Sequence, residues 1–93
     1  MAVIVKKVVP GFLDDILSGQ KNFDLRLNDF EIEPGDTLIL EEYTSADPAT
    51  RQPTGRRVER KVNYVRRFQP QDLWWNEGEI REKGIQVICF DKQ

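Results

Sequence analysis

Three charged residues just after the first predicted helix have the side chains best suited to chemistry. Lys21, Asp24 and Arg26 lie within six positions, and alternating polar and apolar residues over 22–27 predict a half-buried strand. Side chains two positions apart on a strand share a face at about 7 Å, so Asp24 and Arg26 are expected to pair or to share a ligand group. Arg26 suits a phosphate, a carboxylate or a base edge, and Lys21 suits a phosphate or an oxyanion. The alternative is an ion-pair cluster that only closes one end of the fold.

A second basic feature lies between residues 51 and 67. This window carries seven positive residues against one carboxylate, Glu59, although the whole chain has a net charge of −2. The positive residues are Arg51, Arg56, Arg57, Arg60, Lys61, Arg66 and Arg67. A basic strand on an acidic body is typical of a polyanion-binding surface, but also of a long strand that carries its solvated charges there.

Aromatic residues supply further candidates. Tyr43 and Tyr64 lie on strands expected to flank the charged segment, where each has a hydroxyl and a stacking face to offer. Trp74 and Trp75 can stack on nucleic-acid bases, but the preferred interpretation places one of them in the core and the other over the end of the fold.

The composition excludes several kinds of site. The chain has no histidine and one cysteine, Cys89, which is expected in the core. The commonest general base and the usual zinc ligands are therefore missing, and neither a metal nor a cofactor is expected. The longest apolar runs are too short to cross a bilayer, and the first residues lack the charge order of a secretory signal. A cytoplasmic location is the resulting expectation.

The 93 residues predict one domain, residues 1–93, with a single core. The first predicted elements are a strand over Ala2–Val9, a helix over Phe12–Leu17 ended by Gly19, and a strand over 22–27. A turn over Glu33–Asp36, a strand over Thr37–Tyr43 and a hairpin loop over Thr44–Gly55 follow. The rest is predicted as a strand over Arg56–Phe68 with a bulge near Tyr64, a loop with some helix over Gln69–Lys83 and a strand over Gly84–Asp91. This order predicts a mainly β, α+β fold, a small closed or nearly closed barrel with one capping helix after the first strand.

The charged segment resembles a known signature. Gly19-x-Lys21-x-x-Asp24-x-Arg26 is similar to the Gly-x-Lys-x-x-Glu-x-Arg pattern of ASCH domains, with Asp in place of Glu. The residues over 14–19 resemble that family's helix, and those over 34–38 its next turn and strand. Further matches to a small prokaryotic and phage-borne branch of unassigned function are Leu40-Glu41-Glu42-Tyr43, Thr54-Gly55-Arg56 and Lys61-Val62-Asn63-Tyr64. The resemblance implies a PUA-like pseudobarrel.

The resemblance also implies a function. ASCH domains are relatives of RNA-binding PUA domains, so the first hypothesis is an RNA- or nucleotide-binding module with its pocket beside the signature. The expected ligand-binding residues are Lys21, Asp24, Arg26, Tyr43, Arg56, Arg57, Lys61 and Tyr64.

Two other hypotheses stay open. One ASCH relative removes acyl groups from a modified cytidine with a lysine, a threonine and a distant glutamate. Lys21 matches that lysine, Asp24 stands where the threonine would be, and Glu77 or Glu79 is a candidate for the glutamate. A small amidohydrolase, with Lys21 and Asp24 as catalytic residues, is therefore the second hypothesis. The third is a protein-interaction domain that uses its acidic surface.

Overall fold

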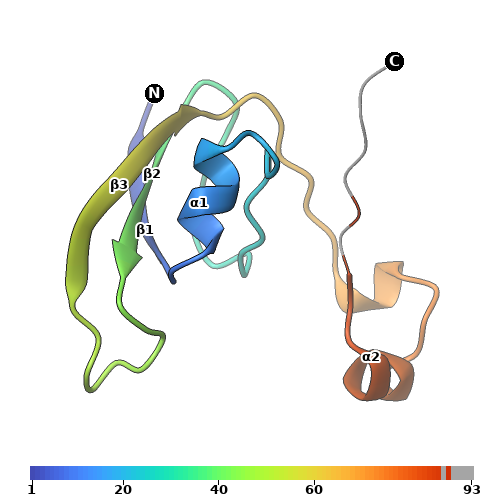
Figure 1. Ribbon diagram of the computed structural model, residues 1–93. Helices are drawn as coiled ribbons and strands as arrows, with labels where there is room; N and C mark the ends of the chain where they lie inside the picture. Colours follow the sequence, from blue (N-terminus) through green and yellow to red (C-terminus); the bar gives the residue numbers. More distant parts are fainter. Residues whose placement is uncertain (87, 89–93) are drawn as a thin grey trace.

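A three-stranded mixed sheet with one helix against its face forms the first part of the molecule (Figure 1). The computed structural model describes residues 1–86 and 88. The strands are β1 (Val3–Val8), β2 (Thr37–Tyr43) and β3 (Pro53–Lys61), in the order β1-β2-β3. β2 pairs in parallel with β1 and antiparallel with β3. The predicted strands over Ala2–Val9 and Thr37–Tyr43 are confirmed.

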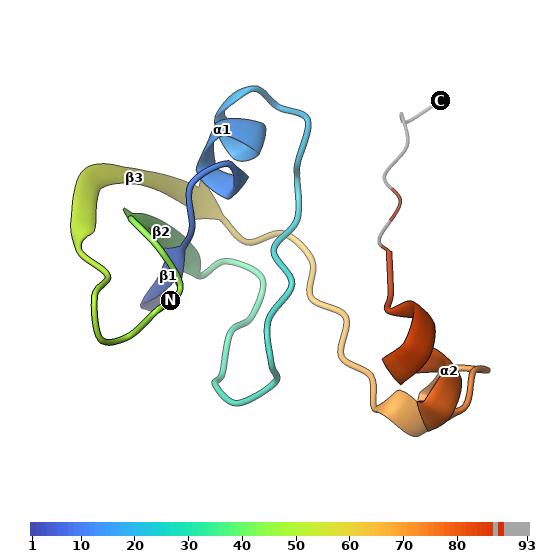
Figure 2. The same ribbon diagram turned by 60° about the horizontal axis from the view of Figure 1, so that its bottom comes forward.

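The helix α1 (Phe12–Leu17) lies against one face of this sheet (Figure 2). Leu13 is fully buried and Ile16 nearly so. They belong to one apolar cluster with three residues from the strands, namely Val8, Leu40 and Val58. After the helix, Gly19 has a φ of +85° and donates its N–H to the Ile16 carbonyl at 3.1 Å. This left-handed conformation favours glycine, so the predicted helix and its stop are confirmed.

The predicted turn over Glu33–Asp36 ties β1 to β2. Gly35 has a φ of +99°, and the Asp36 N–H donates to the Glu33 carbonyl at 3.0 Å, as a type II turn requires. The Asp36 carboxylate accepts N–H groups from Ala2 and Glu33, each at 2.8 Å. These two bonds, the Ala2 bond first, lower the pKa of Asp36 below its ordinary value of 3.8.

Three predictions about the strands are wrong. Residues 22–27 form no strand, and Leu25 and Leu27 are 65% and 80% exposed. The third strand runs over Pro53–Lys61 rather than Arg56–Phe68, and the irregularity in its ladder lies opposite Glu41 and Tyr43 instead of near Tyr64. Alternation along a chain predicts which side chains share a face, but a strand also needs a partner backbone. The α+β class is confirmed, and the sheet among the described residues is open at β1 and β3.

The region from Gln69 onward stands apart from the sheet (Figure 1). It holds a short 3-10 helix, η1 (Pro70–Asp72), and the helix α2 (Glu77–Lys83), which confirms the predicted loop with some helix. Of the described residues after Val58, none is buried. Trp74 and Trp75 are 91% and 50% exposed, so the prediction that one of them lies in the core is wrong. Of the predicted last strand, over Gly84–Asp91, the described residues 84–86 and 88 form no strand, and the other residues, with Cys89, lie outside the described residues.

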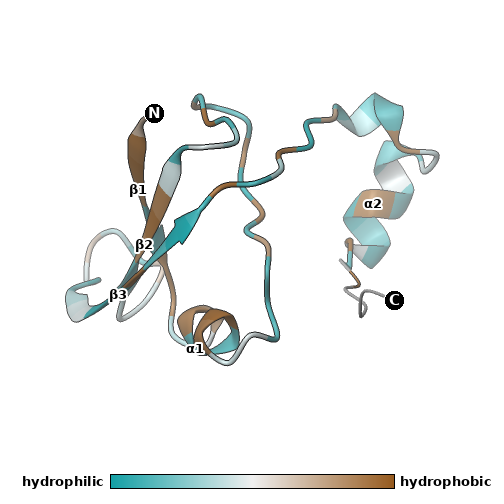
Figure 3. Cartoon of the chain, turned by 90° about the horizontal axis from the view of Figure 1, so that it is seen from above, coloured by the Kyte–Doolittle hydropathy of each residue, from teal (hydrophilic) through white to brown (hydrophobic). Residues whose placement is uncertain are grey.

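The hydropathy of the chain explains this division. Apolar residues gather on β1, β2 and α1, whereas β3 and most of α2 are hydrophilic (Figure 3). The radius of gyration is 15.0 Å, compared with about 12 Å for a compact domain of this length.

Within the described part of the chain, no helix has the length and apolar character needed to cross a membrane.

Candidate functional site

A cavity of about 740 Å³ opens at the carboxyl ends of β1 and β2. Residues at or just after these strand ends line it, together with Phe12 of α1 and part of the segment that follows the helix. Because β1 and β2 are parallel, their carboxyl ends meet at the same edge of the sheet. The volume falls within the range of small-ligand sites, about 300–1,000 Å³.

Four of the eight predicted ligand-binding residues line this cavity. They are Lys21, Asp24, Arg26 and Tyr43. The turn at Gly19 brings the chain back along α1, and the Lys21 N–H donates to the Asp15 carbonyl at 3.0 Å. The helix stop predicted from the sequence therefore fixes the backbone of Lys21 at the cavity.

Asp24 and Arg26 form the predicted pair. Arg26 Nε donates to Asp24 Oδ2 at 2.5 Å, and its Nη2 donates to the Lys7 carbonyl at 2.8 Å. The Asp24 side chain is only 12% exposed. Arg26 thus anchors its segment to β1 without a strand ladder. Asp24 Oδ2 already accepts the Arg26 Nε–H and so is not free to bind and deprotonate a water there, which weighs against a catalytic role for Asp24.

Cations lie over aromatic rings at two places in the cavity. Lys21 Nζ is 4.4 Å from the ring centre of Phe12 and 5.2 Å from that of Phe23. Lys7 Nζ and the Arg51 guanidinium carbon are 5.4 Å and 5.7 Å from the ring centre of Tyr43. Such contacts contribute about 0.5–1 kcal/mol each at exposed sites.

Sequence reasoning missed Lys7 as a site residue and counted Arg51 only within the basic window, although both line the cavity. Arg51 comes from the loop between β2 and β3, and its N–H donates to the Asp47 carbonyl at 2.9 Å. The Asp47 carboxylate also accepts the Ala49 N–H at 3.0 Å. An Asx turn at Asp47-Pro48 was the available signal for this ordered loop, whereas Lys7 reaches the cavity through the parallel β1–β2 pairing, which no local pattern indicates.

The other four predicted residues lie elsewhere. Arg57 neighbours the core residue Val58 on β3 and so projects from the face opposite α1. Lys61 pairs in register with Thr37, at the far end of β2, about 20 Å along the strand from the cavity edge. Tyr64 lies beyond β3 and is 70% exposed.

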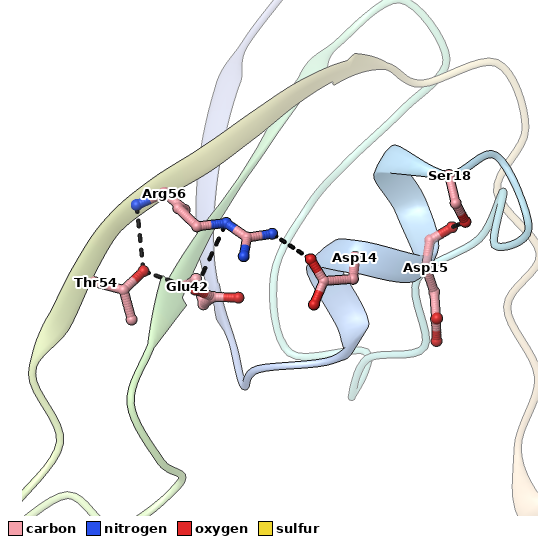
Figure 4. Close-up of polar contacts among 6 residues, drawn as sticks. All are labelled: Asp14, Asp15, Ser18, Glu42, Thr54 and Arg56. Atoms are coloured by element: carbon pink, nitrogen blue, oxygen red, sulfur yellow. Dashed lines mark hydrogen bonds and ion pairs between the residues drawn. The ribbon is translucent and has the colours of Figure 1, made fainter.

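Arg56 joins a separate polar cluster with a buried carboxylate (Figure 4). Its Nη2 donates to Asp14 Oδ1 at 2.5 Å, which raises the pKa of Arg56, and its Nε lies 3.8 Å from Glu42 Oε1. Glu42 is 5% exposed and accepts the Thr54 hydroxyl at 2.8 Å, while its Oε2 has no hydrogen-bond partner among the described residues. This cluster fastens α1 to β2 and β3.

The candidates for a distant catalytic glutamate do not line the cavity. Glu77 and Glu79 lie in the first turn of α2, where Glu79 takes part in a capping box with Asn76. No group of three or more acidic or sulfur ligands with metal-binding geometry occurs in residues 1–86 and 88.

A family described as a domain of unknown function, DUF3850, matches residues 5–75, well over half of the chain. The chain belongs to this family. The DUF3850 match takes in α1, β2, β3, most of β1 and every residue that lines the cavity, and it ends before α2. No curated protein and no solved structure matches the chain.

Proposed function

We propose that this DUF3850 chain is an RNA- or nucleotide-binding module of the ASCH and PUA-like kind, with its ligand in the cavity beside Lys21. One observation carries the proposal. Four cations and two carboxylates line the cavity, whereas the chain as a whole has a net charge of −2. A cleft that gathers positive charge on an acidic body attracts polyanions to that place.

The aromatic rings support the same ligand class. Phe12, Phe23 and Tyr43 line the cavity close to its cations. Aromatic faces stack on nucleobases whatever the base, with about 1–3 kcal/mol for each stacked base. Cations and aromatic rings in one cleft are the combination that single-stranded nucleic acids and nucleotides require.

The pseudobarrel belongs to this proposal. The described sheet has three strands, and the outer edge of β1 carries no partner strand among them. A further strand added at that edge would extend the sheet toward the closed form that the ASCH resemblance implies. The signature residues Lys21, Asp24 and Arg26 all line the cavity, which is the placement that the resemblance requires.

The test is a titration of labelled single-stranded RNA, followed by fluorescence anisotropy at several salt concentrations. We expect the affinity to fall steeply with salt. Lys21→Gln should weaken binding about tenfold. Arg81→Gln, which removes the same charge from α2 outside the cavity, should bind like the unaltered chain.

Salt-independent binding, or no binding of any RNA, DNA or nucleotide, would contradict the proposal. Hydrolysis of acylated nucleosides stays a prediction that the Asp24–Arg26 pair disfavours. Turnover of an acylated nucleoside that is lost in a folded Lys21→Ala variant would support the hydrolase hypothesis. A protein-interaction role also stays a prediction.

A further inference from the structure

Two cations share one aromatic ring at the strand end of the cavity. Lys7 Nζ and the Arg51 guanidinium both lie within 6 Å of the ring centre of Tyr43. Neither forms an ion pair with a carboxylate anywhere in residues 1–86 and 88. A cation without a carboxylate partner is free to bind an anion, and an anion that reaches both side chains is attracted by two charges. This end of the cavity is therefore suited to an anionic group.

The backbone of each cation is held in place. Lys7 belongs to the β1–β2 ladder, and its carbonyl accepts the Arg26 Nη2 group at 2.8 Å. Arg51 follows the Asp47 turn, and its loop is closed by the Thr44 N–H, which donates to the Gln52 carbonyl at 2.9 Å. A site held in place before binding loses less entropy when the ligand arrives.

The part of the cavity beside α1 has a different character. There Lys21 lies over the rings of Phe12 and Phe23, and the carboxylate of Asp15 also lines the wall. Rings with one cation and one carboxylate nearby suit the face and the polar edge of a base better than a phosphate. The two parts of the cavity therefore suit an anionic part and an aromatic part of the ligand.

We infer that Lys7 and Arg51 form a phosphate subsite beside Tyr43, so that the cavity selects a nucleotide or a phosphodiester over the neutral nucleoside with the same base. The inference rests on the proposed function. Arginine presents a planar fork that binds two phosphate oxygens at once, and lysine adds a point charge. Lys21 and the Asp24–Arg26 pair then serve the remainder of the ligand.

The test compares each ribonucleoside with its 5′-monophosphate by titration calorimetry. For the unaltered chain we expect the monophosphate to bind about tenfold more tightly or better. In Arg51→Gln and in Lys7→Gln this preference should fall by about fivefold or more, because the monophosphate loses more affinity than the nucleoside does. Lys7→Arg keeps the charge and should keep the preference, and Arg81→Gln is the control for loss of one charge outside the cavity.

The outcomes separate this inference from the proposed function. Equal affinity for nucleoside and monophosphate, or equal losses of both in Arg51→Gln, would overturn the phosphate subsite while the module remained a nucleotide binder. No measurable monophosphate binding beside intact RNA binding would overturn it as well. If no nucleic acid, nucleotide or nucleoside bound at all, the proposed function itself would fail. Thermal unfolding midpoints close to that of the unaltered chain establish that the variants are folded.

Discussion

The sheet region, residues 1–68, and the C-terminal region, residues 69–86, are stabilised in different ways. Every buried residue of the described chain lies between Val8 and Val58. In the C-terminal region the stabilising contacts are local, namely the capping boxes of Gln69 with Asp72 and of Asn76 with Glu79. Burial holds the sheet region together, whereas hydrogen bonds between near neighbours shape the C-terminal region.

This difference explains where a ligand site is found. A cavity needs side chains held by a surrounding core, and the cavity beside Lys21 lies wholly within the sheet region. Trp74, 91% exposed in the other region, has no comparable support. The candidate residues that line the cavity are therefore placed for binding by tertiary contacts, and Trp74 is not.

The largest expected effect comes from the core of the sheet region. Leu13→Ala removes a fully buried side chain and should lower the free energy of unfolding by about 2–5 kcal/mol. The matched change in the C-terminal region, Ile80→Ala on α2, should cost less than about 1 kcal/mol. Urea titrations followed by circular dichroism measure both. Equal losses would show that α2 packs into the same core and would break the comparison.

The polar cluster that fastens α1 to β2 and β3 should give the next largest effect. Thr54→Val removes the hydroxyl that donates to the buried Glu42 carboxylate. Because Oε2 of Glu42 already lacks a partner among the described residues, this substitution should lower the free energy of unfolding by about 1–3 kcal/mol. Thr50→Val removes an exposed hydroxyl that donates to Asp47 and should cost about 0.5 kcal/mol or less. A smaller loss in Thr54→Val than in Thr50→Val would contradict the importance of the cluster.

A smaller and strictly local effect is expected in α2. Asn76→Ala removes the side chain that accepts the Glu79 N–H at 2.8 Å, which should destabilise that helix by about 1 kcal/mol. Because α2 stands apart from the sheet, amide hydrogen exchange should quicken in α2 and stay unchanged in β2. Faster exchange in both would mean that the two regions unfold together.

The smallest effect concerns pH. Two backbone N–H groups lower the pKa of Asp36 in the folded chain, so its stabilising contribution is present above pH 3.8 and is lost as the pH falls through the lower folded value. Asp36→Asn should lack this part of the acid dependence. Unfolding midpoints measured between pH 2 and pH 6, about two units either side of the ordinary aspartate value, provide the check. Parallel pH curves for the two proteins would contradict the assigned cause.

Local rules predicted the parts of the fold that depend on nearby residues. The helix over Phe12–Leu17, its stop at Gly19 and the turn at Gly35 were all predictable, because positive φ angles and apolar spacing act over a few positions. The pairing of Asp24 with Arg26 was predictable for the same reason. The strand expected over residues 22–27 was not formed, because alternation does not specify a partner backbone.

The sequence by itself determined the α+β class, the helix stop, the turn and the charged segment that lines the cavity. Only the tertiary structure decided which distant residues join that segment. It brought Lys7 and Arg51 to Tyr43 and left Arg57, Lys61 and Tyr64 elsewhere. The reason is physical. The parallel β1–β2 ladder joins residues far apart in the chain, and the loop before β3 is closed by contacts across its two ends. No local pattern encodes which residues will meet in such contacts.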